Sequence, residues 1–189
     1  MLKSGTSRYS ARMNLENGVA NKYNVGVSLN TSYTRDYYNA TGVGLNDNAS
    51  ALYMAQNYDP TVPAYNPDGT YYRSSLMAPM DSPLAVINGQ YGMGDTYRTF
   101  GNIYAEYYFL PSLSAKVRVG ADFNDNQRYF WIDPSTLTGL SYNGYADVRD
   151  GKRGYYLTEA TLNFNKEIKN HRISAVAGAT YERYTSSSI

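Results

Sequence analysis

The sequence predicts an all-β protein, built as an antiparallel up-and-down meander of about six long strands with long loops. Apolar and polar residues alternate along several segments, which is the two-residue period of a β-strand. Short and long connections follow each other in turn, as in an up-and-down sheet. Tyrosine is also abundant, with 22 copies against five phenylalanines and one tryptophan. Its ring is apolar and its tip is polar, so it suits a surface that is half apolar and half wet.

The clearest strand is YNVGVSLNTSYT, residues 23–34. Its odd-numbered positions carry tyrosine, valine, leucine and threonine, and its even-numbered positions carry mainly asparagine, glycine and serine. One face is therefore apolar and the other polar, with an extension to Asp36 left open.

Five further segments alternate in the same way, and we expect each to form a strand. They are residues 8–16, 97–109, 113–124, 155–165 and 172–182. Three connections are short enough for tight hairpins: residues 17–21, 110–112 and 166–170. Two connections are long: residues 37–96 and 125–154.

The first long connection has local signals of its own. The stretch NASALYMAQNY has helical spacing, so we expect a helix over residues 48–58 with Asp47 or Asn48 as its cap. In YNPDGTYY, Pro67 and Gly69 predict a turn. A loop of this length is usually functional or disordered.

Composition excludes several classes of function. The 17 basic and 16 acidic residues give a net charge of +1, with no basic stripe for nucleic acid. The absence of cysteine excludes disulfides and thiolate metal sites. One histidine, His171, argues against a histidine-based metal site or a catalytic triad. We expect no cofactor and no enzyme activity.

The length of the apolar face favours lipid over a protein core. Tyr23 and Tyr33 lie on one face ten residues apart, as do Tyr97 and Tyr107. Ten residues span roughly 33 Å of strand at about 3.3 Å each. A tilt of about 40° reduces this to roughly 25 Å, the height of the apolar band of an outer-membrane barrel. We therefore expect these four tyrosines at the lipid edges. A soluble β-sandwich that serves as a binding or adhesion module is the alternative.

The number of strands predicts that the chain is part of a larger barrel. A bacterial outer-membrane barrel needs at least about eight strands, and open strand edges find no hydrogen bonds in lipid. The first residues lack the apolar segment of a signal peptide, which agrees with this expectation.

Five phrases of the sequence together resemble the SusC/RagA family of TonB-dependent outer-membrane transporters. They are SRYSARMNLEN (7–17), VGVSLNTSYTRD (25–36), PAYNPDGTYY (63–72), GNIYAEYYFLPSLSAKVRVGADF (101–123) and TEATLNFNKEIKNHRISAVAGATYE (158–182). None is specific alone, but their order and joint presence are.

The resemblance implies a section of a 22-stranded transmembrane barrel in the bacterial outer membrane, with long extracellular loops. Residues 1–189 would form part of the barrel domain, without the plug, the TonB-contacting segment and the remaining strands. The family imports nutrients such as glycans, oligosaccharides or peptides beneath a SusD-like surface lipoprotein. The TonB complex would act through the absent N-terminal region, and lipid and nutrient would be further partners.

Aromatic side chains in the predicted loops are candidates for contact with substrate or with the lid lipoprotein. They are Tyr53, Tyr58, Tyr65, Tyr71, Tyr72 and Trp131. Packing of the loops against themselves is an equal alternative.

Other polar groups receive structural interpretations. Two acid pairs, Asp122 with Asp125 and Asp147 with Asp150, are assigned to a strand end and a hydrated loop. The stretch DFNDNQ partly matches a calcium loop, but Gln127 stands where that loop requires glycine. His171 is expected beside a tight turn. Polar-face residues Glu106, Lys116 and Arg118 are expected to face the lumen or the plug.

Overall fold

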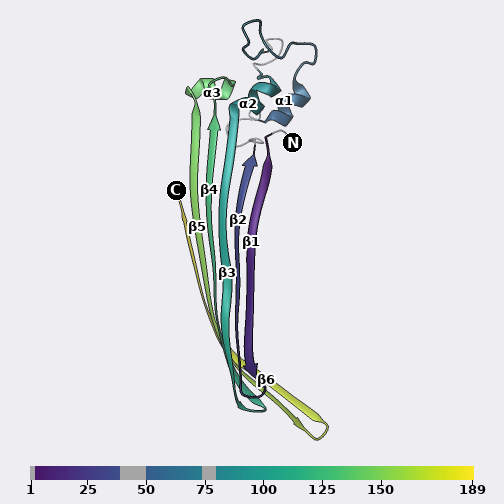
Figure 1. The fold of residues 1–189 in the computed structure, drawn as a ribbon, viewed down its shortest axis with the longest axis vertical. Helices are drawn as coiled ribbons and strands as arrows, with labels where there is room; N and C mark the ends of the chain where they lie inside the picture. Colours follow the sequence, from purple (N-terminus) through teal and green to yellow (C-terminus); the bar gives the residue numbers. More distant parts are fainter. Residues whose placement is uncertain (1–2, 39–49, 74–79) are drawn as a thin grey trace. The chain divides into compact units, whose positions relative to one another are not determined.

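The computed structural model describes residues 3–38, 50–73 and 80–189. It contains one six-stranded antiparallel sheet in which the strands lie in sequence order (Figure 1). The strands are β1 (Gly5–Val19), β2 (Tyr23–Tyr38), β3 (Gln90–Leu110), β4 (Leu113–Ile132), β5 (Tyr145–Ile168) and β6 (His171–Ser188). The predicted all-β meander is therefore confirmed. The six strands form one sheet, whereas a sandwich would divide them between two facing sheets.

Three strand pairs are joined by the tight turns that the sequence predicts. The turns are shorter than expected and comprise residues 20–22, 111–112 and 169–170. Asn21 and Lys169 have φ angles of 57° and 54°, in the left-handed region that tight turns use. His171 begins β6 directly after the last turn, as expected.

The strands extend further than the alternation predicts, which corrects the second long loop. β4 continues to Ile132 and β5 begins at Tyr145, so the connection is residues 133–144 rather than 125–154. The apolar pattern of β4 changes face along its length: Val117 and Val119 are odd-numbered, whereas the buried Phe130 and Ile132 are even-numbered. A pattern that changes phase does not look like one continuous strand in the sequence.

This extension places several predicted loop residues in strands. Trp131 belongs to β4, and Asp147 and Asp150 belong to β5 rather than to a hydrated loop. Asp125 also lies inside β4. All four are polar or aromatic residues in segments where strict alternation has ended, so the sequence pattern did not assign them to strands.

The chain divides into two compact units. We name Met1–Ser7, Thr34–Asp95 and Gln127–Asp150 the loop unit, and Arg8–Tyr33, Thr96–Asn126 and Gly151–Ile189 the strand unit. All buried apolar side chains among the described residues lie in the loop unit: Met54, Ala85, Val86, Phe130 and Ile132.

Three short helices belong to the loop unit, and each begins at a hydroxyl cap. They are α1 (Ala51–Asn57), α2 (Pro83–Gly89) and α3 (Leu137–Tyr142), capped by Ser50, Ser82 and Thr136. The helix predicted over residues 48–58 is confirmed as α1. The proposed caps Asp47 and Asn48 lie outside the described residues. The sequence did not predict α2 or α3, because both are too short to show a helical period.

Gly92 in β3 lies against Tyr38, so a substitution at this position tests how closely the two residues pack. A Cβ at Gly92 would lie 2.6 Å from the Tyr38 carbonyl oxygen and 2.6 Å from its ring. At Gly94, on the same face two residues later, the nearest atom would be 3.8 Å away. We expect Gly92→Ala to lower the free energy of unfolding by about 1–3 kcal/mol, as overpacking does. Gly94→Ala is the matched control in urea titrations, and equal effects of the two variants would contradict this packing.

Candidate functional site

The strand unit presents an apolar face that no described part of that unit covers. Residues on this face are between one third and two thirds exposed, and Ile103 is 58% exposed. The aliphatic members are Leu15, Val25, Leu29, Ile103, Val117, Val119, Leu162 and Ile173. Soluble monomers rarely expose contiguous apolar patches of more than a few hundred Å². This face therefore requires an apolar environment or a partner.

Aromatic rings form the rim of this face. Tyr33 and Tyr97 stack with ring centroids 4.6 Å apart. Phe123 meets Tyr156 edge to face at 5.3 Å. The sequence predicts Tyr33 and Tyr97 at lipid edges without pairing them, and the structure brings their two rings together.

The other two predicted edge tyrosines lie near the hairpin ends of β2 and β3. The Tyr108 N–H donates to the Lys22 carbonyl at 3.0 Å, which places the start of β2 beside the end of β3. Tyr107 packs edge to face on Phe109 at 5.2 Å. The hydroxyl of Tyr23 donates to Asn17 Oδ1 at 3.3 Å. Each ring thus lies close to a polar turn.

The opposite face of the strand unit is polar and cross-linked by charge. Arg98 Nη2 contacts Asp122 Oδ2 at 2.6 Å, and Arg118 contacts Glu159 at 3.5 Å. Lys116 Nζ lies 4.2 Å from the centre of the Tyr104 ring. These contacts place Lys116 and Arg118 on the polar face, as the sequence predicts.

The acid pairs are not pairs in space. Asp122 contacts Arg98 on the polar face, whereas Asp125 lies 3.7 Å from Lys152 beside the aromatic rim. Residues three apart on a strand point to opposite faces, so these carboxylates cannot act together on one group. The same spacing applies to Asp147 and Asp150 in β5. No cluster of three or more potential metal ligands occurs within residues 3–38, 50–73 and 80–189.

The loop tyrosines divide into exposed and packed groups. Tyr53 on α1 and Tyr65 are 41% and 48% exposed. Tyr65 forms a β-bridge with Tyr71, and their ring centroids are 5.4 Å apart. The Tyr58 hydroxyl donates to the Tyr72 carbonyl at 2.9 Å, and burial raises the pKa of that phenol. Four of the predicted residues thus cluster between residues 58 and 72.

Trp131 has a different environment. Its ring lies against Gly144, where a Cβ would be 3.1 Å from the indole, and Gly144 has a φ angle of 94°. The side chain is 45% exposed on β4. Trp131 thus packs beside Gly144 rather than with the tyrosines between residues 58 and 72.

The buried carboxylate of Asp81 joins two segments of the loop unit that are far apart in sequence. Asp81 is 2% exposed and accepts a hydrogen bond from the Leu137 N–H at 2.6 Å. Arg73 Nε lies 3.5 Å from its other oxygen, and Arg73 Nη2 donates to the Ser135 carbonyl at 2.9 Å. Burial raises the pKa of Asp81, against the smaller opposing effects of the Leu137 N–H and Arg73. Arg73 and Asp81 are thus joined to the backbone of Ser135 and Leu137, at the start of α3.

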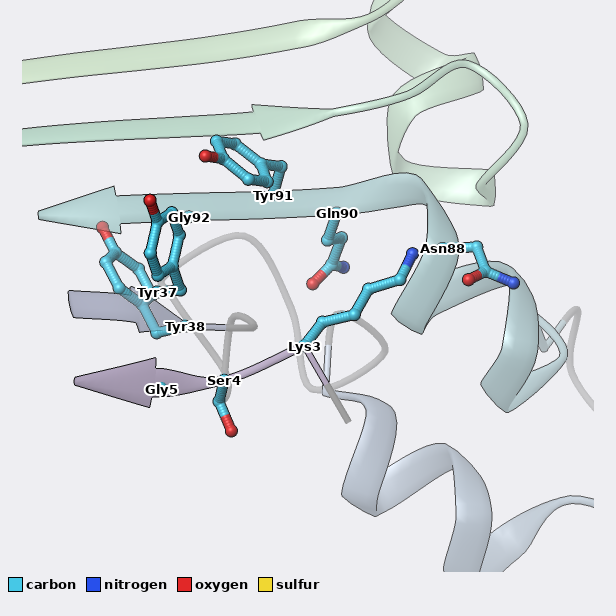
Figure 2. Close-up of a pocket in the computed structure, with 9 residues that line it drawn as sticks. All are labelled: Lys3, Ser4, Gly5, Tyr37, Tyr38, Asn88, Gln90, Tyr91 and Gly92. Carbon is cyan, nitrogen blue, oxygen red and sulfur yellow. The ribbon is translucent and has the colours of Figure 1, made fainter. Parts of the chain in front are cut away.

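A cavity of about 530 Å³ lies at the strand ends of the loop unit (Figure 2). Lys3 reaches from just before β1 toward Asn88 of α2, and Gln90 points into the same space (Figure 2). Tyr37 and Tyr91, whose rings are 6.3 Å apart, line it as well. The sequence analysis missed these residues, although the aromatic pair at residues 37–38 was a usable signal.

No protein-family model matches the sequence. The chain is 30% identical to TonB-dependent receptor P26 of Formosa agariphila over 187 residues, which is 95% of this chain and 18% of that receptor. It is 26% identical to TonB-dependent receptor P3 of the same organism over 190 residues, 97% of this chain and 18% of that receptor. The chain thus spans less than a fifth of the length of these curated relatives.

Solved structures show the same fold. The structure of the RagAB peptide transporter matches with a TM-score of 0.73 at 17% identity, covering 98% of this chain and 22% of that one. The RagAB peptide importer in its open-open state matches with a TM-score of 0.75 at 16% identity, covering 98% and 21%. The chain is therefore similar in sequence to a section of TonB-dependent receptors and similar in fold to part of the RagAB transporter.

The chain consists mainly of long strands of one sheet and the segments that connect them. The proteins that it resembles are receptors, a transporter and an importer, which agrees with the expectation that it is not an enzyme. Within the described ranges, no helix is both long enough and apolar enough to cross a membrane.

The buried Asp81 generates a prediction about pH. Its raised pKa means that the folded state binds a proton more readily than the unfolded chain. Its contribution to stability therefore increases as the pH falls through the folded pKa toward about 3.9, the ordinary value of an aspartate. We expect the unfolding midpoint of wild type, relative to Asp81→Asn, to rise between pH 7 and pH 4.

Asp133 provides a control of opposite sign. The Ser135 N–H and hydroxyl lower the pKa of this carboxylate, so its contribution to stability is lost as the pH falls. Wild type should therefore lose its advantage over Asp133→Asn on acidification. Thermal unfolding of wild type and both variants at each pH measures the two differences in midpoint. If the midpoints of Asp81→Asn and wild type changed equally with pH, the prediction for Asp81 would be wrong.

Proposed function

We propose that this chain forms part of the barrel wall and external loops of an outer-membrane, TonB-dependent nutrient importer. The observation that carries the proposal is the strand unit, whose apolar face is uncovered and edged by aromatic rings while its opposite face is joined by ion pairs. Lipid would cover the apolar face, and the polar face would line the lumen or contact a plug. TonB would act through parts of the protein outside these residues.

Strand edges support a larger barrel. All residues of β1 and β6, the outer strands of the sheet, are exposed. Each outer strand has one edge without a neighbouring strand in this sheet, and in lipid every backbone group needs a hydrogen-bond partner. Neighbouring strands of the same barrel would supply those partners. The proposal therefore concerns residues 1–189 as one section of the barrel domain.

We infer that the nutrient is an oligosaccharide or a peptide, and that a SusD-like surface lipoprotein closes over the loops. The names of the RagAB structures refer to a peptide, which supports the peptide alternative. Exposed Tyr53 and Tyr65 offer ring faces for sugar rings or for the lid, together with Tyr71, Tyr72 and Trp131. Tyr58, with its hydroxyl bound inside the loop unit, would support that surface from below.

A charge on the apolar face tests the membrane assignment. Val119 is 47% exposed on the apolar face of β4, and Thr161 lies on the polar face of β5. We expect Val119→Arg to weaken folding into phospholipid vesicles by about 2–4 kcal/mol, the cost near the bilayer midplane. Thr161→Arg, the matched control, should fold nearly as well as wild type. A folded, monodisperse monomer without detergent would exclude a lipid-facing surface.

The exposed loop tyrosines generate a second test. Tyr53→Ala combined with Tyr65→Ala should slow nutrient uptake or weaken lid binding about fivefold, since an aromatic contact contributes about 1 kcal/mol. The unfolding midpoint should not change. Tyr58→Phe should lower the unfolding midpoint and leave uptake and lid binding unchanged, because it removes an internal hydrogen bond. Uptake assays and lid co-purification check the first, and a lowered midpoint without loss of uptake or binding would show that the loops only pack on themselves.

A further inference from the structure

We propose that a notch beside Lys152, at the aromatic rim of the strand unit, binds the anionic headgroup of a membrane lipid. This inference rests on the proposed function, because it requires the apolar face to lie in a bilayer. It adds a specific, charge-selective lipid site to a surface that otherwise contacts lipid only through apolar side chains.

Two lysines bracket the apolar face along β5. Lys152 and Lys166 are both even-numbered, and all apolar-face residues between them have small, aliphatic, aromatic or threonine side chains. These residues are Gly154, Tyr156, Thr158, Ala160, Leu162 and Phe164. The pairing of β5 with β6 is regular from Gly151 to Ile168, so no bulge changes the face between the lysines. Lysines in this position extend along apolar surface and place their ammonium groups in the headgroup layer.

The length between the lysines fits a bilayer. Fourteen residues separate them, which corresponds to roughly 46 Å along a strand at about 3.3 Å per residue. A tilt of about 40° leaves roughly 35 Å across the membrane. This exceeds the hydrocarbon thickness of about 30 Å and stays within the 40–45 Å that include the headgroups. Each ammonium group would therefore lie among headgroups.

The Lys152 end has a shaped recess. A notch of about 230 Å³ is lined by Tyr97, Thr99, Phe123, Asp125 and Lys152, with Asn124 and Arg153. Tyr97 and Phe123 are 52% and 45% exposed, so their rings can contact the upper acyl chain and glycerol of a lipid. The Lys152 side chain is 62% exposed beside these rings. An apolar wall next to a solvated cation matches the two parts of an anionic lipid.

Charge at this rim favours an anion. Asp125 contacts Lys152 at 3.7 Å, but both side chains are well exposed, and such pairs contribute about 0–1 kcal/mol. An ammonium group has three donors, and one carboxylate does not occupy them all. Arg183 of β6 stands directly opposite Tyr156 and thus on the same face. The lining of the notch itself contains two cations, Lys152 and Arg153, and one carboxylate, Asp125.

A photocrosslinker in the notch tests the proposal. The full receptor, with Thr99 replaced by p-benzoylphenylalanine, is reconstituted in vesicles of equal parts phosphatidylglycerol and phosphatidylethanolamine. Lipid adducts are then counted by mass spectrometry. We expect roughly fivefold more phosphatidylglycerol adducts, because a lysine near an anionic surface contributes about 1 kcal/mol and a tenfold ratio corresponds to 1.4.

Variants in the same crosslinking background identify the group responsible. Lys152→Gln should bring the adduct ratio close to one, and Lys152→Arg should preserve it. Asp125→Asn should raise the ratio by removing the competing carboxylate. Two matched controls should leave it unchanged: Lys166→Gln, on the same face at the other end of β5, and Lys116→Gln, on the polar face of β4.

The outcomes separate this inference from the proposed function. Lipid adducts without preference for phosphatidylglycerol, or a preference that survives Lys152→Gln, would overturn the notch site alone. The absence of any lipid adduct from a folded receptor would show that the face does not contact lipid, which would overturn the proposed function as well.

Discussion

The alternation of side chains between the two faces of each strand is the constraint on which this structure depends. Backbone hydrogen bonds join the six strands into one sheet. Within each strand, odd-numbered and even-numbered residues therefore lie on opposite faces of that sheet. A slip of one residue between β4 and β5 would carry Arg118 to the apolar face and Val117 to the polar one. The ion pairs and the aromatic rim are therefore two consequences of one register.

Opposite chemistry on the two faces explains why the strand unit lacks a protein core. Its polar face is satisfied by cross-strand pairs such as Arg98 with Asp122, and its apolar face exposes aliphatic residues between aromatic rings. A single sheet cannot bury its own apolar face. An apolar environment must do so, and lysines at both ends of the β5 face match the chemistry of a bilayer edge.

The loop unit follows a different rule. There buried Phe130 and Ile132 form a small apolar cluster with Tyr38 and Tyr145. The ion pair of Arg73 with Asp81 also binds the backbone of Ser135 and Leu137, which are distant in sequence. Asp81 is held by the Leu137 N–H and by Arg73, so the position of α3 depends on a carboxylate that is costly to bury.

The sequence by itself determined the meander, its tight turns and the apolar face on which Tyr23, Tyr33, Tyr97 and Tyr107 were expected, whereas the stacking of Tyr33 on Tyr97 came from the tertiary structure. These features depend on a local two-residue period, which is visible in the order of residues. Tertiary structure alone decided the extension of β4 through Trp131, the short helices α2 and α3, and the cavity lined by Lys3 and Tyr91. Along β4 the apolar residues change from odd-numbered Val117 and Val119 to even-numbered Phe130 and Ile132, so the period that identifies a strand is broken. Contacts such as Asp81 with Leu137 join residues 56 positions apart, and no local pattern encodes them.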